Sequence, residues 1–229
     1  MPGPVDLVET YVSPETLEAR LAQWLERTAP YRWRREIPIR AETSALLVVD
    51  MTRAFVDPDR PLSSPNARVI LPRVAELVTA FRQRGRPVIW LVQGHHCVAY
   101  DRGELLSDWW PVPILEGTPD VEPAEGLSVL PQEKVILKRR YSGFYQTDLE
   151  LTLRCLKVEA VVVCGVLTNV CPFATAFDAF HRGFRVYVPA DGTASLNEAL
   201  HVGALCTLAG WAATVTGGGT IGRWLSGGG

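Results

Sequence analysis

The 229-residue sequence has no long hydrophobic run and no excess of positive charge. Its longest apolar runs are five to seven residues, which is too short for a helix that crosses a membrane. A formal net charge of −2 provides no basic surface for nucleic acid or for an anionic membrane. We therefore expect neither a nucleic-acid partner nor a membrane partner.

The sequence also lacks closely paired cysteines. Its five cysteines are scattered, and none forms a C-x-x-C pair; they stand at positions 97, 155, 164, 171 and 206. This odd, dispersed set argues against a disulfide framework and a structural zinc site, and it favours a reducing compartment. Residues 1–12 lack the basic and apolar segments of a secretion signal. We expect a cytoplasmic protein.

What the sequence does contain is a series of short apolar runs without polar alternation. Such runs are typical of strands buried on both faces in a parallel sheet. They cover 45–50, 87–93, 134–138, 160–166, 185–189 and 212–216, and helical patterns cover 66–84, 146–157, 170–182 and 196–210. This alternation predicts an α/β fold: a doubly wound, mainly parallel six-stranded sheet with helices on both faces, a Rossmann-like three-layer sandwich.

Two terminal segments lie outside this alternation. Residues 14–27 have an amphipathic helical pattern, and we expect the whole N-terminal arm, 1–43, to pack on a main domain that spans 44–216. The glycine-rich tail, 217–229, is expected to fray, and residues 221–225 within it are candidates to dock on the domain.

Three chemically active side chains stand at the ends of predicted strands. Asp50 ends the first strand, Lys138 ends the third, and Cys171 follows the fourth through the segment "LTNVC". Each alone has a simple structural explanation, as a capping aspartate, a solvated lysine or a buried cysteine. Because ligands bind at the carboxyl ends of parallel strands, where all three meet, their convergence favours a functional site.

The three residue types together suit a cysteine nucleophile. A carboxylate can accept the thiol proton, and an ammonium group and a helix N-terminus can stabilise a thiolate. Pro172 is tolerated in a first helical turn, so we expect Cys171 to open the 170–182 helix. The N–H of Cys171 is then available as a donor to an oxyanion.

Three segments, in this order, resemble the signature blocks of the isochorismatase-like cysteine hydrolases: "ALLVVDM", "ILKRRYSGFYQTDLELTLR" and "VVVCGVLTNVCPFATAFDAFHRGFRVYVPADGTAS". The resemblance covers about residues 44–216. The family includes nicotinamidases, N-carbamoylsarcosine amidases, ureidoacrylate and maleamate amidohydrolases, and isochorismatases. It implies that Asp50, Lys138 and Cys171 form a catalytic triad and that the protein is a homodimer or homotetramer.

The resemblance also implies the surroundings of the triad. It predicts a cis peptide bond between Val166 and Leu167, and an oxyanion hole made by the backbone N–H groups of Leu167 and Cys171. Other residues near the strand ends are candidates for substrate binding: Phe55, His95, His96, Tyr141, Thr168 and Asn169. Trp109 and Trp110 suit a pocket wall, an oligomer interface or a core.

Nicotinamidases carry an aspartate and histidine metal site after the first block. Here the corresponding segment offers Asp57 and Asp59 but no histidine, so we expect no metal and no cofactor. The sequence thus predicts a cysteine-dependent amidohydrolase that cleaves a C–N amide or ureido bond of a small molecule through a thioester.

Two other functions stay open on the sequence alone. One is an isochorismatase-type vinyl-ether hydrolase with Asp50 as the general acid. The other is a catalytically inactive binding protein on the same scaffold. The presence of Cys171 favours amide hydrolysis, because cleavage of a vinyl ether has no use for a cysteine nucleophile.

Overall fold

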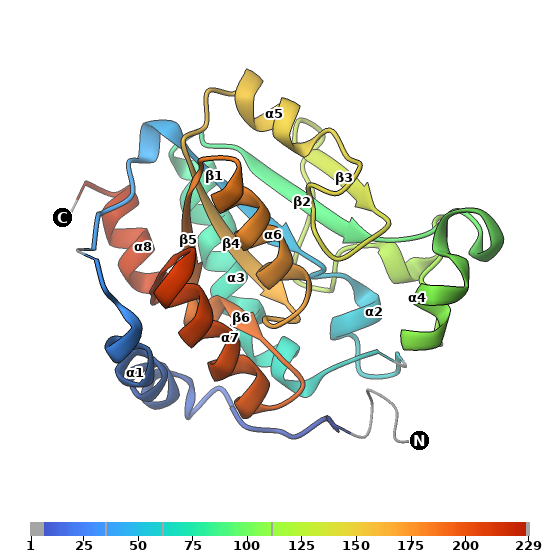
Figure 1. Cartoon of the computed structure of the whole chain (residues 1–229), viewed down its shortest axis with the longest axis horizontal. Helices are drawn as coiled ribbons and strands as arrows, with labels where there is room; N and C mark the ends of the chain where they lie inside the picture. Colours follow the sequence, from blue (N-terminus) through green and yellow to red (C-terminus); the bar gives the residue numbers. More distant parts are fainter. Residues whose placement is uncertain (1–6, 35, 61, 111, 228–229) are drawn as a thin grey trace.

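Within the residues that the structure describes (7–34, 36–60, 62–110 and 112–227), seven parallel strands form one sheet. In this computed structural model their order is β3-β2-β1-β4-β5-β7, and the short β6 pairs with β4 (Figure 1). The strands are β1 (Ser44–Val49), β2 (Val88–Gln93), β3 (Lys134–Lys138), β4 (Ala160–Val166), β5 (Arg185–Pro189), β6 (Thr193–Ala194) and β7 (Thr214–Thr216). The predicted doubly wound, mainly parallel sheet is confirmed, and β6 is a strand that the sequence did not indicate.

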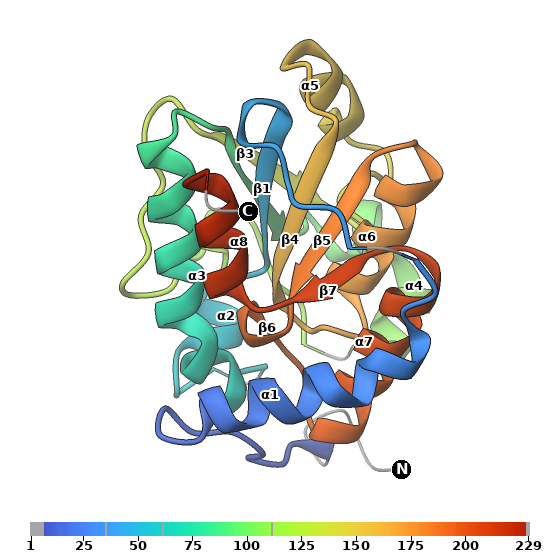
Figure 2. The ribbon, with the colours of Figure 1, turned by 90° about the vertical axis from the view of Figure 1, so that its left-hand side faces the viewer.

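Helices cover both faces of the sheet, as predicted (Figures 1 and 2). They are α1 (Leu17–Thr28), α2 (Arg53–Val56), α3 (Pro65–Gln83), α4 (Gly103–Trp109), α5 (Leu149–Cys155), α6 (Cys171–His181), α7 (Glu198–Trp211) and α8 (Gly218–Leu225). Short turns complete the chain: the 3-10 segments η2 (Ala29–Tyr31), η3 (Ala41–Thr43), η5 (Pro119–Val121) and η6 (Ala190–Gly192), and the π-helical segment η4 (Val98–Arg102). The sequence did not predict α2 and α4, since four and seven residues carry too little periodicity.

Each inner strand contributes to two hydrophobic clusters, one on each face of the sheet. In β1, Leu47 and Val49 pack in the cluster that contains α1, α5, α6 and α7. Leu46 and Val48 pack in the opposite cluster, with α2, α3 and α8. Because both faces are covered, these strands read as continuous apolar runs without polar alternation.

The strand β3 differs from the expectation of burial on both faces. Its residues Val135 and Leu137 are 46% and 39% exposed. β3 is the edge strand of the sheet, next to β2, and one of its faces is open to solvent. An apolar run therefore predicted the strand correctly and its burial incorrectly.

The two terminal segments are more ordered than their compositions suggest. The tail forms the helix α8, in which Ile221 and Leu225 are buried and the N–H of Gly218 donates to the carboxylate of Asp191 (2.7 Å). The helix α1 packs against α7, and it begins at Leu17 because Ser13 and Thr16 form a preceding turn. Residues 1–6 of the predicted arm and 228–229 of the predicted tail lie outside the described residues. Among the described residues, no helix has the length and apolar character that a membrane span requires.

A close approach between β1 and β4 generates a test of this architecture. Gly165 in β4 has a φ of +111°, and a Cβ atom there would lie 1.9 Å from the carbonyl oxygen of Val49. Gly165→Ala is expected to lower the free energy of unfolding by at least about 4 kcal/mol, because backbone must move to admit the methyl group. Denaturant titration measures the loss.

The matched control is Gly203→Ala in the middle of α7, where an added Cβ meets no atom within 4 Å. Helix propensity predicts a stabilisation of up to about 1 kcal/mol for this change. If Gly165→Ala had the stability of the parent protein, the strands would not approach each other as described.

Candidate active site

The side chains of Asp50, Lys138 and Cys171 meet at the carboxyl edge of the sheet. Asp50 directly follows β1, Lys138 is the last residue of β3, and Cys171 is the first residue of α6, which follows β4. The strand order changes direction between β1 and β4, so this edge is the topological switch point where α/β proteins bind ligands. The predicted position of Cys171 in the first turn of the helix is confirmed.

Asp50 and Lys138 form a completely buried ion pair. The Nζ atom of Lys138 lies 2.8 Å from Oδ2 of Asp50, and both side chains are 0% exposed. Gln93, at the end of β2, contacts both partners: its N–H donates to Oδ1 of Asp50 (2.7 Å), and its Oε1 accepts from Lys138 (3.0 Å). These hydrogen bonds offset the large cost of removing two charges from water, which pairing alone does not fully cover.

The backbone at Asp50 helps to aim this carboxylate. Asp50 has a φ of 53°, in the left-handed region that few residues other than glycine adopt. Its N–H donates to the carbonyl of Leu91 (2.9 Å), which ties the residue to β2. Unusual backbone conformations of this kind are held by the surrounding structure and concentrate at functional sites.

The thiol of Cys171 is buried beside this ion pair. Burial raises the pKa of the thiol, the Asp50 carboxylate raises it further, and the Lys138 ammonium lowers it by less, so the net shift is upward. For Lys138, burial opposes the charge, but the carboxylate of Asp50 offsets that effect and holds its pKa above the usual value. At neutral pH the site therefore contains a protonated thiol next to a carboxylate, instead of the preformed thiolate that a neighbouring lysine suggests.

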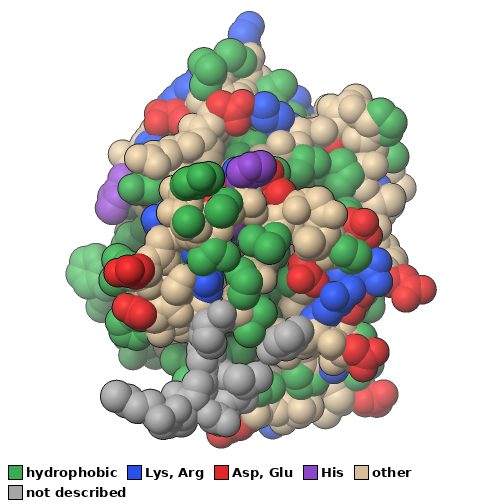
Figure 3. All heavy atoms as spheres, turned by 90° about the vertical axis from the view of Figure 1, so that its right-hand side faces the viewer, with side chains coloured by type: hydrophobic (Ala, Val, Ile, Leu, Met, Phe, Trp, Pro, Cys, Tyr) green, Lys and Arg blue, Asp and Glu red, His purple; other side chains and the backbone are tan. Residues whose placement is uncertain are grey.

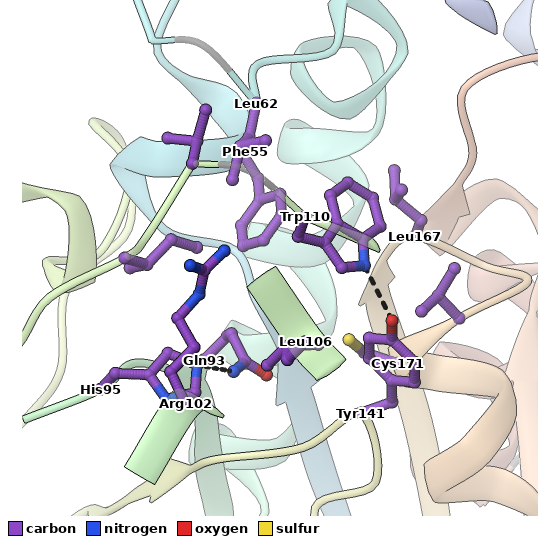
Figure 4. A pocket seen from close by; sticks show the side chains of 13 residues that line it. Phe55, Leu62, Gln93, His95, Arg102, Leu106, Trp110, Tyr141, Leu167 and Cys171 are labelled. Atoms are coloured by element: carbon purple, nitrogen blue, oxygen red, sulfur yellow. Dashed lines mark hydrogen bonds between the residues drawn. The ribbon is translucent and has the colours of Figure 1, made fainter. Parts of the chain in front are cut away.

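A mainly apolar cavity opens in front of Cys171 (Figure 4). Its walls come from α2, the segment after β2, α4 and the loop before α6, and they consist of Phe55, Leu62, Gln93, His95, Arg102, Leu106, Trp110, Val112, Ile114, Tyr141, Leu167, Val170 and Cys171. The surface that carries α4 is hydrophobic in its central part, with charged side chains around it (Figure 3). A small organic molecule with a hydrocarbon portion fits such a cavity.

Three of the predicted substrate-binding residues line this cavity: Phe55, His95 and Tyr141. The indole N–H of Trp110 donates to the hydroxyl of Tyr141 (2.8 Å), so Trp110 belongs to the cavity wall. Its neighbour Trp109 points away and is 69% exposed. The two adjacent tryptophans thus have different environments.

Gln93 also fixes the protonation of His95. Because its carbonyl oxygen accepts from Lys138, its amide group donates to Nε2 of His95 (2.9 Å), which places the histidine proton on Nδ1. Burial lowers the pKa of His95, and three nearby arginines lower it further, whereas Asp101 raises it. His95 is therefore a neutral, oriented part of the cavity wall.

The other three predicted binding residues lie outside the cavity. His96 is exposed. Thr168 is buried and its hydroxyl contacts Nδ1 of His201 (2.8 Å), while the amide oxygen of Asn169 accepts from the hydroxyl of Ser195. Burial lowers the pKa of His201 to about 3, so this imidazole is neutral at physiological pH. Thr168 and Asn169 brace the loop that precedes Cys171 from behind.

The N-terminal arm reaches the same loop through these braces. The hydroxyl of Tyr11 accepts from the N–H of Ser195 (3.0 Å). Tyr11 and Trp24 also pack against the ring of His201, with centroids 5.7 and 4.6 Å away. An arm outside the three sequence blocks thus supports the segment that presents the thiol.

The two residues of the predicted oxyanion hole lie in the loop before α6 and at the start of this helix. The peptide bond between Val166 and Leu167 is cis, as the resemblance implied. Cys171 begins α6, so its N–H is one of the amides that have no acceptor within the helix.

Among the described residues, no group of three or more His, Cys, Asp or Glu side chains is arranged to hold a metal, and Asp57 is paired with Arg53 (2.8 Å).

Sequence reasoning missed two polar residues of the cavity wall, Gln93 and Arg102. A polar residue at the carboxyl end of the apolar run "PVIWLVQ" was a usable signal for Gln93, because Asp50 and Lys138 were found by the same rule. Arg102 gave no such signal. It lies in an irregular segment, and only the fold turns it inward.

This chain is similar to known proteins over most of its length. The isochorismatase domain family matches residues 44–218. Nicotinamidase 3 of Arabidopsis thaliana is 35% identical over 185 residues, which cover 80% of this chain and 88% of that protein. Ureidoacrylate amidohydrolase of Methylobacterium radiotolerans is 32% identical over 198 residues, which cover 76% of this chain and 77% of that protein. The crystal structure of a cysteine hydrolase from Pseudomonas syringae pv. phaseolicola superposes with a TM-score of 0.80 at 27% identity and covers 84% of this chain and 97% of its own.

The electrostatics of the thiol predict opposite effects for the two charged neighbours. Asp50→Asn removes the charge that raises the pKa of Cys171, so alkylation of Cys171 by iodoacetamide should begin at lower pH. Lys138→Met removes the charge that lowers this pKa, so alkylation should move to higher pH. Each shift should be roughly one to three pH units, and peptide mass spectrometry reports it specifically for Cys171.

Lys134→Met is the control, because Lys134 lies at the far end of the same strand in an exposed pair with Asp148. It should leave the alkylation profile unchanged. Circular dichroism checks that each variant folds, since breaking a buried pair can cost about 3–5 kcal/mol. Shifts of the same sign in Asp50→Asn and Lys138→Met would contradict the assigned electrostatics.

Proposed function

The chain belongs to the isochorismatase family, and we propose that it is a cysteine-dependent amidohydrolase that cleaves a C–N amide or ureido bond of a small molecule. The observation that carries this proposal is the position of Cys171, at the start of α6, against a buried Asp50–Lys138 pair and at the wall of an apolar cavity. Two of its relatives, nicotinamidase 3 and ureidoacrylate amidohydrolase, are named as enzymes that hydrolyse C–N bonds.

The first half-reaction forms a thioester. The sulfur of Cys171 attacks the carbonyl carbon of the bound amide while Asp50 accepts the thiol proton. The negative charge that develops on the carbonyl oxygen is held by the backbone N–H groups of Leu167 and Cys171. The tetrahedral intermediate collapses as Asp50 returns the proton to the nitrogen, and ammonia or an amine departs.

The second half-reaction releases the acid. Asp50 accepts a proton from a water molecule, whose oxygen attacks the thioester carbon. The same two amides hold the oxyanion. Collapse of this intermediate breaks the C–S bond, and the sulfur recovers its proton from Asp50. One amide and one water thus give one acid and one amine, and the enzyme returns to its starting state.

Lys138 has a supporting role in this cycle. Its ammonium group fixes Oδ2 of Asp50, and Gln93 fixes Oδ1, so the carboxylate is held in one orientation beside the sulfur. The positive charge also stabilises the thiolate character that develops during attack, since Lys138 lowers the pKa of Cys171. The raised resting pKa makes proton transfer to Asp50 a part of the attack itself.

The proposal extends to the assembly and its compartment. We propose a homodimer or homotetramer, because the edge strand β3 exposes the apolar side chains of Val135 and Leu137. A cytoplasmic location fits the cysteines, which are all free thiols in the structure.

Replacement of the nucleophile tests the proposal directly. Cys171→Ala should lower kcat/KM by at least about 10³-fold, because the thioester cannot form. Ammonia release measures the rate, with nicotinamide, N-carbamoyl amino acids, ureidoacrylate, maleamate and biuret as trial substrates. Rapid quenching and mass spectrometry should detect an acyl group on Cys171 in the parent enzyme.

Cys164→Ala is the matched control. Cys164 is also completely buried, in β4, and the change removes the same atom, but its thiol contacts the carbonyl of Leu47 and does not face the cavity. Its kcat/KM should stay within about threefold of the parent value. Ammonia release by Cys171→Ala at a rate within tenfold of the parent would instead show that Cys171 is not the nucleophile.

A further inference from the structure

Arg102 is a charged residue inside the apolar cavity, and the mechanism above does not use it. It ends the π-helical segment η4, lies next to α4, and is only 4% exposed. Its side chain lines the same cavity as Cys171. Figure 4 shows the guanidinium group pointing inward, on the other side of the cavity from the Cys171 sulfur.

The guanidinium group of Arg102 is incompletely paired. Its Nη1 donates to the hydroxyl of Ser107 (2.8 Å), and that hydroxyl donates to the carbonyl of Gly103 (2.8 Å). Among the described residues, Nη2 of Arg102 has no hydrogen-bond partner although it is buried. Burial lowers the pKa of Arg102, and no carboxylate offsets the effect. An unpaired buried charge is costly, and a protein retains it only where something else repays the cost.

Several other arginines of the molecule are paired with carboxylates. Arg139 is paired with Asp101 and Glu116, Arg82 with Glu133, and Arg73 with Asp191. Each of these three arginines thus has a carboxylate partner. Arg102 instead donates to the hydroxyl of Ser107 and lines the cavity.

The rest of the cavity narrows the chemistry of its occupant. Among the described residues that line it, Arg102 is the only one with a permanent charge, because His95 is neutral and the others are uncharged or apolar. Leu62, Leu106 and Ile114 offer contact only to hydrocarbon. A molecule that fills this space and pairs with Arg102 has an anionic end and an apolar middle.

We propose that Arg102 binds a carboxylate of the substrate, so that the enzyme acts on an amidic or ureido acid whose carboxylate is separated from the scissile C–N bond by a short hydrocarbon segment. This inference rests on the proposed function and specifies its substrate class. The planar guanidinium group suits a carboxylate, to which it can donate two parallel hydrogen bonds. The pair anchors one end of the substrate and places the carbonyl carbon at Cys171.

Such a site discriminates strongly against neutral amides. A neutral molecule of the same shape leaves the buried guanidinium unpaired, and sites built to pair with a polar group reject analogues that lack it. The preference should appear mainly in KM and kcat/KM, since the carboxylate lies away from the reacting atoms.

The activity test compares matched substrates in matched variants. Succinamate, glutaramate and adipamate are the acid probes, and levulinamide is the neutral analogue of succinamate, with a methyl ketone in place of the carboxylate. Arg102→Met should lower kcat/KM for the best acid probe by roughly 10- to 100-fold and change that for levulinamide by less than about threefold. Arg102→Lys keeps the charge but lacks the planar group that donates two parallel hydrogen bonds, so its loss of kcat/KM should be intermediate.

Arg140→Met is the control, because Arg140 lies close to Arg102 in space but donates to the backbone carbonyls of Asp101 and Arg139 and does not line the cavity. It should retain the preference for acids. Arg102→Met removes a buried charge and keeps an unbranched apolar side chain, so we expect the variant to fold, and circular dichroism checks it. Equal loss of activity on acid and neutral probes, or a parent enzyme that prefers levulinamide, would overturn the proposal.

A binding test separates this proposal from the proposed function. Calorimetry measures succinamate, glutaramate, adipamate and levulinamide on Cys171→Ala and on the double variant Cys171→Ala/Arg102→Met, neither of which needs turnover. Binding of an acid probe that is weakened roughly 10- to 100-fold by Arg102→Met supports the carboxylate site, even if the parent protein hydrolyses none of the amides. In that case only the amidohydrolase function fails. If no acid probe binds, or if Arg102→Met binds it equally well, the carboxylate site is refuted whatever the catalytic activity.

Discussion

The site depends on one interaction, the buried ion pair between Asp50 and Lys138. The two residues end β1 and β3, which are not neighbours, and Gln93 at the end of β2 joins them through hydrogen bonds to both. The pair therefore exists only if β3, β2 and β1 are adjacent and in register. In turn, the completely buried charges need a dry, well-packed surrounding, which both hydrophobic clusters of the sheet provide.

Burial and the ion pair together set the protonation of the thiol. Burial and the nearby carboxylate keep Cys171 protonated, against the weaker effect of Lys138. A neutral buried thiol is a poor target for oxidants and other electrophiles, because the thiolate is the reactive form. In the proposed mechanism the carboxylate beside it accepts the proton once a carbonyl group lies in the cavity, and reactivity is then coupled to occupation by substrate.

In the function and substrate class proposed above, chemistry and specificity come from different parts of the fold. The triad stands on strand ends and on the first residue of a helix, whereas Arg102 comes from the segment that connects β2 to β3. Behind the site, Thr168 and Asn169 are held by His201 and Ser195, which the N-terminal arm contacts through Tyr11. A rigid sheet can thus keep one reaction while the connecting segment selects the substrate.

The sequence by itself determined the strands at 134–138, 160–166 and 185–189, the parallel sheet, and the meeting of Asp50, Lys138 and Cys171, because these follow from local apolar runs and from the rule that parallel strands end at one edge. It did not determine the helix α8, since a glycine-rich tail becomes helical only where Ile221 and Leu225 find a core and Asp191 meets Gly218. Nor could it show that Thr168 faces His201 or that Arg102 faces the cavity. Burial and hydrogen-bond partners depend on residues far away in the chain, and only the tertiary structure brings those residues together.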